Sequence, residues 1–132
     1  PGGIAACLLH PEKNVISVMG DGGFLMNVQE LETAKRLGVG YTVIVLNDND
    51  YGLISWKQDR HTGKTAGTKI NNPDFVRLGE SFGIESFNPS TPAELDEVLK
   101  SRLPKKEMTL IQINIETEVN QELIKKLKKH FA

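Results

Sequence analysis

The sequence has little cysteine, little net charge and no long apolar run, and each shortage excludes a class of protein. A single cysteine, Cys7, rules out a disulfide framework within the chain and a metal site built from several cysteines. With 16 Lys and Arg against 17 Asp and Glu the net charge is −1, so no positive excess favours nucleic acid. No apolar run approaches the roughly 18 residues that cross a bilayer. We expect a soluble, cytoplasmic domain with no nucleic-acid partner and no membrane partner.

The length and composition fit one ordinary domain. The chain has 132 residues, of which 39% are hydrophobic, so it can bury a core. It begins Pro1-Gly2-Gly3 without an initiator methionine and runs directly into the apolar stretch at residues 4–9. Because a natural domain rarely starts on a buried element, we expect residues 1–132 to be a fragment of a longer protein.

Segments of strand type and helix type alternate along the chain. Runs such as YTVIVL, β-branched and almost wholly apolar, predict strands that are covered on both faces. Strands are expected at residues 15–19, 41–46, 84–87 and 108–115. Helices are expected at residues 4–9, 27–37, 53–58, 73–82, 91–103 and 118–131, with a polar loop at residues 59–72. The alternation predicts an α/β fold with a parallel, doubly wound sheet flanked by helices.

Capping residues mark the ends of several expected helices. Asn27 stands three residues before Glu30, as in a capping box, and Gly38 is placed to close the same helix. Asn72 precedes Pro73, which fits the first turn of a helix, so Asn72 is expected to be the N-cap there.

Two acidic loops directly follow predicted strands. GDGGF occupies residues 20–24 and NDNDYG occupies residues 47–52. Ligands of parallel α/β sheets bind beyond the carboxyl ends of the strands, and the 27 residues from Asp21 to Asp48 make one strand–helix–strand crossover. Neighbouring strands would therefore bring the two carboxylates to one cation. Each loop alone is more typical of a turn, and it is the pair at crossover spacing that indicates a site.

A hard cation that carries phosphates suits these loops. Mg²⁺ takes about six oxygen ligands at roughly 2.0–2.1 Å and usually keeps substrate phosphates among them. Gly20, Gly22 and Gly23 have no Cβ, so their backbone N–H groups can approach an anion closely. The helix expected from Asn27 would point its positive end at that anion.

The same residues resemble a known cofactor motif. Gly20-Asp21-Gly22, then a helix and a strand, then Asn47-Asp48, is similar to the thiamin-diphosphate-binding motif of thiamin-diphosphate-dependent enzymes. Over GDGGFLMNVQELETAKRLGVGYTVIVLNDNDYG the chain resembles the acetolactate synthases. The resemblance covers essentially the whole chain. It implies that residues 1–132 are the C-terminal part of the pyrophosphate-binding domain, with the thiamin-diphosphate-binding α/β fold.

The resemblance also implies individual cofactor contacts. Asp21 and Asp48 would each give a side-chain oxygen to Mg²⁺, and Asp50 would give its backbone carbonyl. The remaining cofactor-binding residues would be Gly20, Gly22, Gly23 and the turn at Tyr51-Gly52 against the diphosphate, and Leu53 near the cofactor rings. Many relatives carry Asn where Asp48 stands, and an Asp there resembles the catabolic, flavin-independent acetolactate synthases.

The activity implied is the condensation of two pyruvates to 2-acetolactate and CO₂, in a homo-oligomer that is a dimer or a tetramer. The glutamate that assists the cofactor comes from another domain in such enzymes, and nothing in this chain matches it. No catalytic residue is therefore assigned here, and the isolated fragment is expected to be inactive. The motif leaves pyruvate oxidases, 2-oxoacid decarboxylases and glyoxylate carboligases open, and it leaves open a role in acetoin or branched-chain amino acid synthesis. From the residues alone, a non-catalytic α/β binding domain also stays open.

Overall fold

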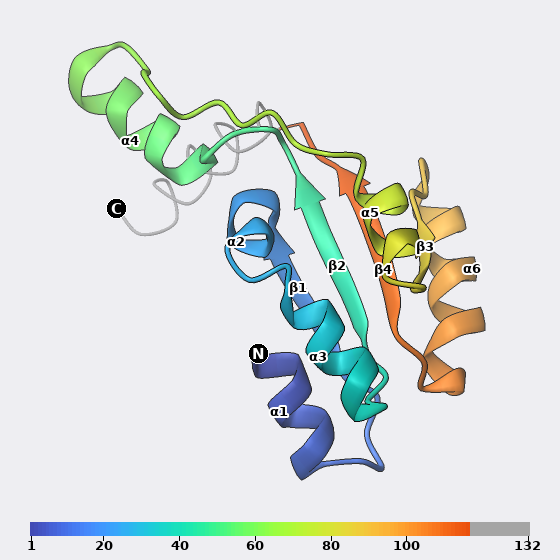
Figure 1. Cartoon of the computed structure of the whole chain (residues 1–132). Helices are drawn as coiled ribbons and strands as arrows, with labels where there is room; N and C mark the ends of the chain where they lie inside the picture. The colour runs from blue at the N-terminus through green and yellow to red at the C-terminus, as the bar shows by residue number, and fades with distance from the viewer. Residues whose placement is uncertain (117–132) are drawn as a thin grey trace, which may run out of the picture.

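A parallel sheet of four strands forms the centre of the computed structural model, which describes residues 1–116 (Figure 1). Its spatial order is β1-β2-β4-β3. The strands are β1 (Ile16–Gly20), β2 (Thr42–Asn47), β3 (Glu85–Phe87) and β4 (Thr109–Asn114). Every pairing is parallel, which confirms the predicted sheet. The helix predicted at residues 118–131 lies outside the described residues.

Helices connect the strands and flank the sheet. They are α1 (Gly2–Leu9), α2 (Asp21–Leu25), α3 (Glu30–Leu37), α4 (Gly52–Thr62), α5 (Phe75–Ser81) and α6 (Pro92–Arg102), followed by the 3₁₀ turn η1 (Leu103–Lys105). Gly38 closes α3 in the left-handed conformation, with φ of 66°, as predicted. No helix within residues 1–116 is long and apolar enough to cross a membrane.

The helix expected from Asn27 is wrong at its start. The chain already enters a helix at Asp21, and α3 begins only at Glu30. A capping box would need the Glu30 N–H to bond the Asn27 side chain, but this N–H donates to the Asn27 backbone carbonyl at 3.1 Å. Successive tight turns therefore join α2 to α3. The positive helix end predicted near Asn27 is not placed at the GDGG loop.

Two further boundaries differ from the expectation. Helix α4 runs on to Thr62 and closes at Gly63, so the predicted polar loop is shorter. Helix α5 is capped by Asp74, whose Oδ1 accepts the Arg77 N–H at 3.1 Å. Asn72 lies two residues before that cap, and its side chain turns to other partners. Its assignment as the N-cap is therefore wrong.

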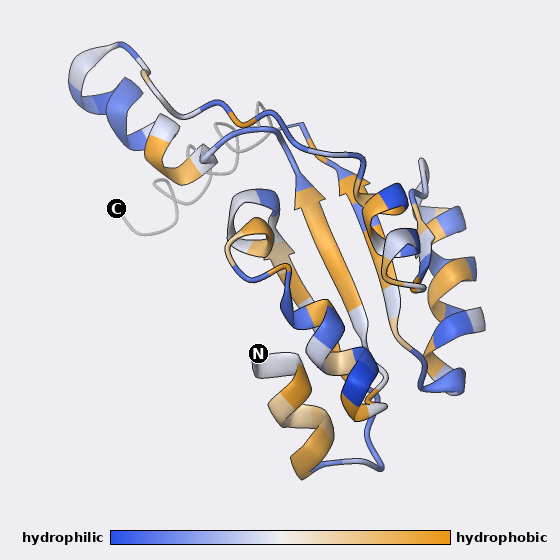
Figure 2. Ribbon diagram, in the orientation of Figure 1, coloured by the Kyte–Doolittle hydropathy of each residue, from blue (hydrophilic) through white to orange (hydrophobic). Residues whose placement is uncertain are grey.

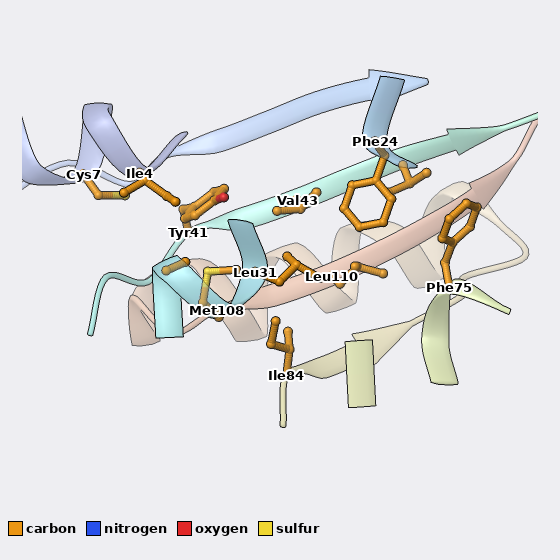
Figure 3. Close-up of a cluster of buried hydrophobic side chains, with 12 residues drawn as sticks. Ile4, Cys7, Phe24, Leu31, Tyr41, Val43, Phe75, Ile84, Met108 and Leu110 are labelled. Carbon is orange, nitrogen blue, oxygen red and sulfur yellow. The ribbon is translucent and has the colours of Figure 1, made fainter. Parts of the chain in front are cut away.

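The core lies between one face of the sheet and the helices α1, α2, α3 and α5 (Figure 3). Val43 and Val45 of β2 and Leu110 of β4 meet helix side chains there. Phe24 of α2 and Phe75 of α5 are in edge-to-face contact, with ring centroids 5.5 Å apart. Strand β2 is apolar along most of its length, as is helix α1 (Figure 2). This packing holds α2 and α5 next to one another.

Strands β1, β2 and β4 end at the same edge of the sheet. In the register, Gly20 lies opposite Leu46, and Asn47 lies opposite Asn114. The loops after β1 and β2 therefore leave the sheet side by side, as the sequence predicts. Helix α4 projects away from the sheet at this edge and has no buried residue (Figure 1). The fold thus places both acidic loops at one edge.

The contact between Phe24 and Phe75 predicts a large stability effect. Phe75 is fully buried, so Phe75→Ala should lower the free energy of unfolding by about 3–5 kcal/mol. Arg77→Ala on the exposed side of the same helix should change it by less than about 0.5 kcal/mol. Urea unfolding followed by circular dichroism measures both values, and equal effects of the two variants would contradict the predicted core.

Candidate functional site

Asp21 is a buried carboxylate at the end of β1. Its side chain is 2% exposed. Oδ1 accepts the Gly22 N–H at 2.7 Å, and Oδ2 accepts the Asn49 N–H at 2.9 Å and a hydrogen bond from Asn72 Nδ2. A carboxylate has about four acceptor positions, so these donors occupy both positions of Oδ2 and leave one on Oδ1. Asp21 is thus held by protein donors and still has an oxygen available to a ligand.

The loop after β2 is shaped to reach Asp21. Asn49 is in the left-handed conformation, with φ of 55°, which Asn tolerates better than most residues. This conformation turns the Asn49 N–H toward Asp21. The loop also pairs with the segment before α5, because the Tyr51 N–H donates to the Thr68 carbonyl at 2.8 Å and the Ile70 N–H donates to the Asn49 carbonyl at 2.9 Å. These two hydrogen bonds join the chain just before α4 to the chain that follows it.

Asp48 lies in a negatively charged environment. Burial raises the pKa of its carboxyl above the ordinary value, and the charges of Asp21 and Asp50 raise the pKa further. A hydrogen bond from the Asp50 N–H, at 3.2 Å from Asp48 Oδ1, opposes this rise only in part. A carboxylate whose pKa is raised by burial and by neighbouring negative charges favours a bound cation.

The side chain of Asp50 forms an ion pair with Lys69. Asp50 Oδ2 lies 3.1 Å from Lys69 Nζ. Burial alone would raise the pKa of Asp50, but hydrogen bonding from Thr68, Lys69 and Ser55 outweighs burial and lowers the pKa. With its side chain engaged by Lys69, Asp50 would offer a ligand its backbone carbonyl, which accepts no backbone hydrogen bond from the described residues.

The glycines of the two loops have different surroundings. A Cβ on Gly20 or Gly23 would meet nothing within 4 Å, so space is open beside both residues. A Cβ on Gly22 would come within 2.5 Å of the Tyr51 ring, so Gly22 is required for the packing of Tyr51. A Cβ on Gly52 would lie 2.7 Å from Asp48 Oδ2. Two of these glycines therefore serve contacts within the loops.

Leu53 lies in the first turn of α4 and is 66% exposed. It therefore remains at the surface of the described chain. Within residues 1–116, no three His, Cys, Asp or Glu side chains are grouped so as to hold a metal ion. A metal at this edge would thus need two carboxylates, a backbone carbonyl and further oxygens from a bound small molecule.

Comparison with known families identifies the fold and the loops together. Residues 1–113 match the C-terminal TPP-binding domain of thiamine pyrophosphate (thiamin diphosphate) enzymes. The chain belongs to this family. The sequence resemblance and the parallel α/β fold are thereby confirmed, and the buried Asp21 lies within the matched part of this TPP-binding domain.

Individual relatives of the TPP-binding domain agree. The chain is 35% identical over its whole length to an acetolactate synthase of Bacillus subtilis, of which it covers 23%. It is 34% identical over 88% of its length to an acetolactate synthase large subunit of Haemophilus influenzae, of which it covers 21%. The chain thus spans about a fifth of the length of the curated relatives it matches.

A solved structure shares the fold. The thiamine diphosphate-dependent 4-hydroxybenzoylformate decarboxylase of Rhodococcus jostii RHA1 superposes with a TM-score of 0.81 at 28% identity. The match covers 88% of this chain and 22% of that protein. The relatives identified by sequence and by structure therefore belong to one family, and their names give them different reactions.

The network around Asp21 contains three asparagines whose contacts the sequence does not predict. The sequence assigns Asn47 and Asn49 to the acidic loop after a strand and Asn72 to a helix cap. In the structure all three belong to the hydrogen-bond network around Asp21. Asn47 is marked in the sequence by its place after a strand and by the resemblance to the cofactor motif. No local pattern points to Asn72, because its partner Asp21 is 51 residues away in the sequence.

The environment of Asp48 predicts a pH-dependent effect on stability. Its raised pKa means that the folded state disfavours the charged carboxylate, so Asp48→Asn should raise the melting temperature of the cofactor-free protein near neutral pH. The gain should fall as pH drops through the raised pKa, and it should vanish below the unfolded value of about 3.9, where Asp48 is neutral in both states.

Thermal unfolding at a series of pH values measures this effect. Glu97→Gln, on the exposed face of α6, is the control and should change nothing at any of these pH values. A gain from Asp48→Asn that persists unchanged at about pH 3, below the unfolded pKa of about 3.9, would contradict the electrostatic explanation.

Proposed function

We propose that this chain is the cofactor-anchoring segment of an acetolactate synthase, which condenses two molecules of pyruvate to 2-acetolactate and CO₂. In this proposal thiamin diphosphate is held through Mg²⁺. Asp21 and Asp48 give side-chain oxygens to the metal and Asp50 gives its backbone carbonyl. Gly20, Gly22, Gly23 and the turn at Tyr51-Gly52 lie against the diphosphate, and Leu53 lies near the cofactor rings.

The environment of Asp21 carries the proposal. Asp21 is 2% exposed, it directly follows β1, and its Oδ1 keeps one acceptor position unused. Burying a charge is costly unless it is paired, and the donors here are neutral N–H groups. A cation on Oδ1 would complete the coordination of Asp21, and it would also offset the repulsion that raises the pKa of Asp48.

The other loop residues fit a metal diphosphate as well. Hard divalent cations such as Mg²⁺ prefer oxygen ligands and retain phosphate oxygens, which suits a site with two carboxylates and one carbonyl. The open space beside Gly20 and Gly23 leaves room for phosphate oxygens near backbone N–H groups. Lys69 pairs with the side chain of Asp50, so the carbonyl of Asp50 is the group left for the metal.

When bound, thiamin diphosphate supplies the carbon nucleophile and the electron sink that decarboxylation and carbon–carbon bond formation require. The residues of this chain bind and orient it: Asp21 and Asp48 fix the metal, and the loops fix the diphosphate. The activating glutamate and the remaining walls of the site would come from other domains and from a second subunit of a dimer or tetramer. The chain thus anchors the cofactor, and other parts of the enzyme do the chemistry.

A 2-oxoacid decarboxylase is the second candidate. It is favoured by the structural similarity to a thiamine diphosphate-dependent decarboxylase. Pyruvate oxidase and glyoxylate carboligase would use the same anchor, since the anchor recognises the cofactor rather than the substrate. The similarity to the acetolactate synthases of Bacillus subtilis and Haemophilus influenzae favours acetolactate synthase over these alternatives. A non-catalytic binding domain would keep the fold and would lack cofactor affinity.

Substitution of the acidic residues tests the anchor. In the full-length protein, Asp21→Ala should weaken the binding of thiamin diphosphate with Mg²⁺ by more than about 100-fold, because it removes a charged ligand as well as the acceptor for neighbouring donors. Asp48→Ala should weaken binding severely. Asp48→Asn should stay within about tenfold of the wild type, since an amide oxygen still ligates.

Isothermal titration calorimetry with and without Mg²⁺ measures these affinities. Asp96→Ala, an exposed carboxylate of α6 that pairs with Lys100, is the matched control and should bind as the wild type does. Wild-type affinity in Asp21→Ala would remove the metal role of Asp21. If the wild-type protein itself showed no affinity, the chain would be a non-catalytic domain.

The division of labour predicts that residues 1–132 alone are inactive. The isolated chain should form no measurable acetolactate from pyruvate at saturating Mg²⁺ and cofactor, because it lacks the activating glutamate and the rest of the site. A colorimetric acetoin assay after acid decarboxylation measures the product. Activity above that of the isolated Asp21→Ala chain would show that the chain holds more of the active site than we assign to it.

A further inference from the structure

One side chain, Asn72, joins three parts of the fold at the edge of the site. It lies in the segment that precedes α5. Its amide nitrogen Nδ2 donates to Asp21 Oδ2 at the start of α2, and to Asn47 Oδ1 at the end of β2, at 2.7 Å. Asn72 is 51 residues from Asp21 in the sequence, so this contact depends wholly on the tertiary fold.

The two acceptors explain why an amide stands at position 72. An amide nitrogen carries two N–H donors, and both are used here. A hydroxyl would supply one donor and a carboxylate none, and a carboxylate would add a second negative charge beside Asp21. Asn72 Oδ1 is buried and accepts no hydrogen bond from the described residues. The donor side of the amide therefore accounts for its placement.

The contact fixes the orientation of the Asp21 carboxylate. Asn49 N–H and Asn72 Nδ2 both bind Oδ2, so this oxygen is saturated and Oδ1 keeps the unused acceptor position. Asn72 is the donor that ties Asp21 to the sheet, because Asn47 in turn donates to Asn114 Oδ1 at 3.2 Å. A chain of hydrogen bonds thus connects the Asp21 carboxylate to the ends of β2 and β4.

We propose that Asn72 is a positioning residue for the cofactor anchor: it holds Asp21 with Oδ1 available before a metal binds. The inference rests on the proposed function, because it requires Asp21 to be a metal ligand. Partners that orient a ligand in this way typically change metal affinity by about 10–100-fold when they are removed. Asn72 acts through Asp21, so its effect disappears when the carboxylate of Asp21 is absent.

The test measures the affinity of the full-length protein for thiamin diphosphate at saturating Mg²⁺, by titration calorimetry. Asn72→Ala should weaken binding about 10–100-fold. Asn72→Ser retains one donor and should lose less. Asn71→Ala, at the exposed neighbouring residue, should stay within about twofold of the wild type. Melting temperatures of the cofactor-free variants report whether each one folds.

A double-substitution cycle separates positioning from a merely structural role. In an Asp21→Ala background, adding Asn72→Ala should change the affinity by less than about threefold, because no side-chain oxygen is left at position 21 to orient. Phe75→Leu, which reduces core packing below the site and leaves every hydrogen bond in place, should lower the melting temperature without the loss of affinity.

The outcomes distinguish this inference from the proposed function. If the wild-type protein does not bind the cofactor, the proposed function and this inference both fail. If the wild type binds and Asn72→Ala binds as tightly as Asn71→Ala, only the role of Asn72 is overturned. Equal losses in the wild-type and Asp21→Ala backgrounds, or failure of both Asn72 variants to fold, would also assign Asn72 a structural role and overturn the inference.

Discussion

The burial of one carboxylate constrains the whole edge of this sheet. Asp21 is almost inaccessible to solvent, so its oxygens need donors from the protein. Those donors come from the following turn, from the loop after β2 and from the segment before α5. The left-handed backbone of Asn49 and the position of Asn72 both follow from this requirement. Three distant segments are thereby brought to one point.

The apolar core packs next to the hydrogen-bond network of Asp21. Phe24 follows Asp21 on α2 and Phe75 follows Asn72 on α5, and the two rings are in contact. The polar contact between Asp21 and Asn72 therefore lies three residues along the chain, on both sides, from an aromatic contact in the core. Because packing fixes α2 against α5, the donors of Asp21 are in place in the folded chain and need no ligand to assemble them.

The sequence predicts the sheet and the acidic loops but not the network around Asp21. Strand β2 is recognisable from its apolar run, and Asp21 and Asp48 from their places after two strands at crossover spacing. The start of α3 was wrong because the Glu30 N–H bonds a backbone carbonyl rather than the predicted cap. Asn72 was assigned to a local cap, and its real partners lie 51 and 25 residues away, where no local pattern reaches them.

The central claim, that Asp21 and Asp48 share one metal, is tested most directly by locating the metal. Crystals of the full-length protein with thiamin diphosphate and Mn²⁺ in place of Mg²⁺ would give an anomalous difference peak at the ion. The account predicts one peak within about 2–2.5 Å of a side-chain oxygen of Asp21 and of Asp48, with a diphosphate oxygen in the same coordination shell. A peak elsewhere, or bound cofactor with no metal contact to Asp21, would contradict it.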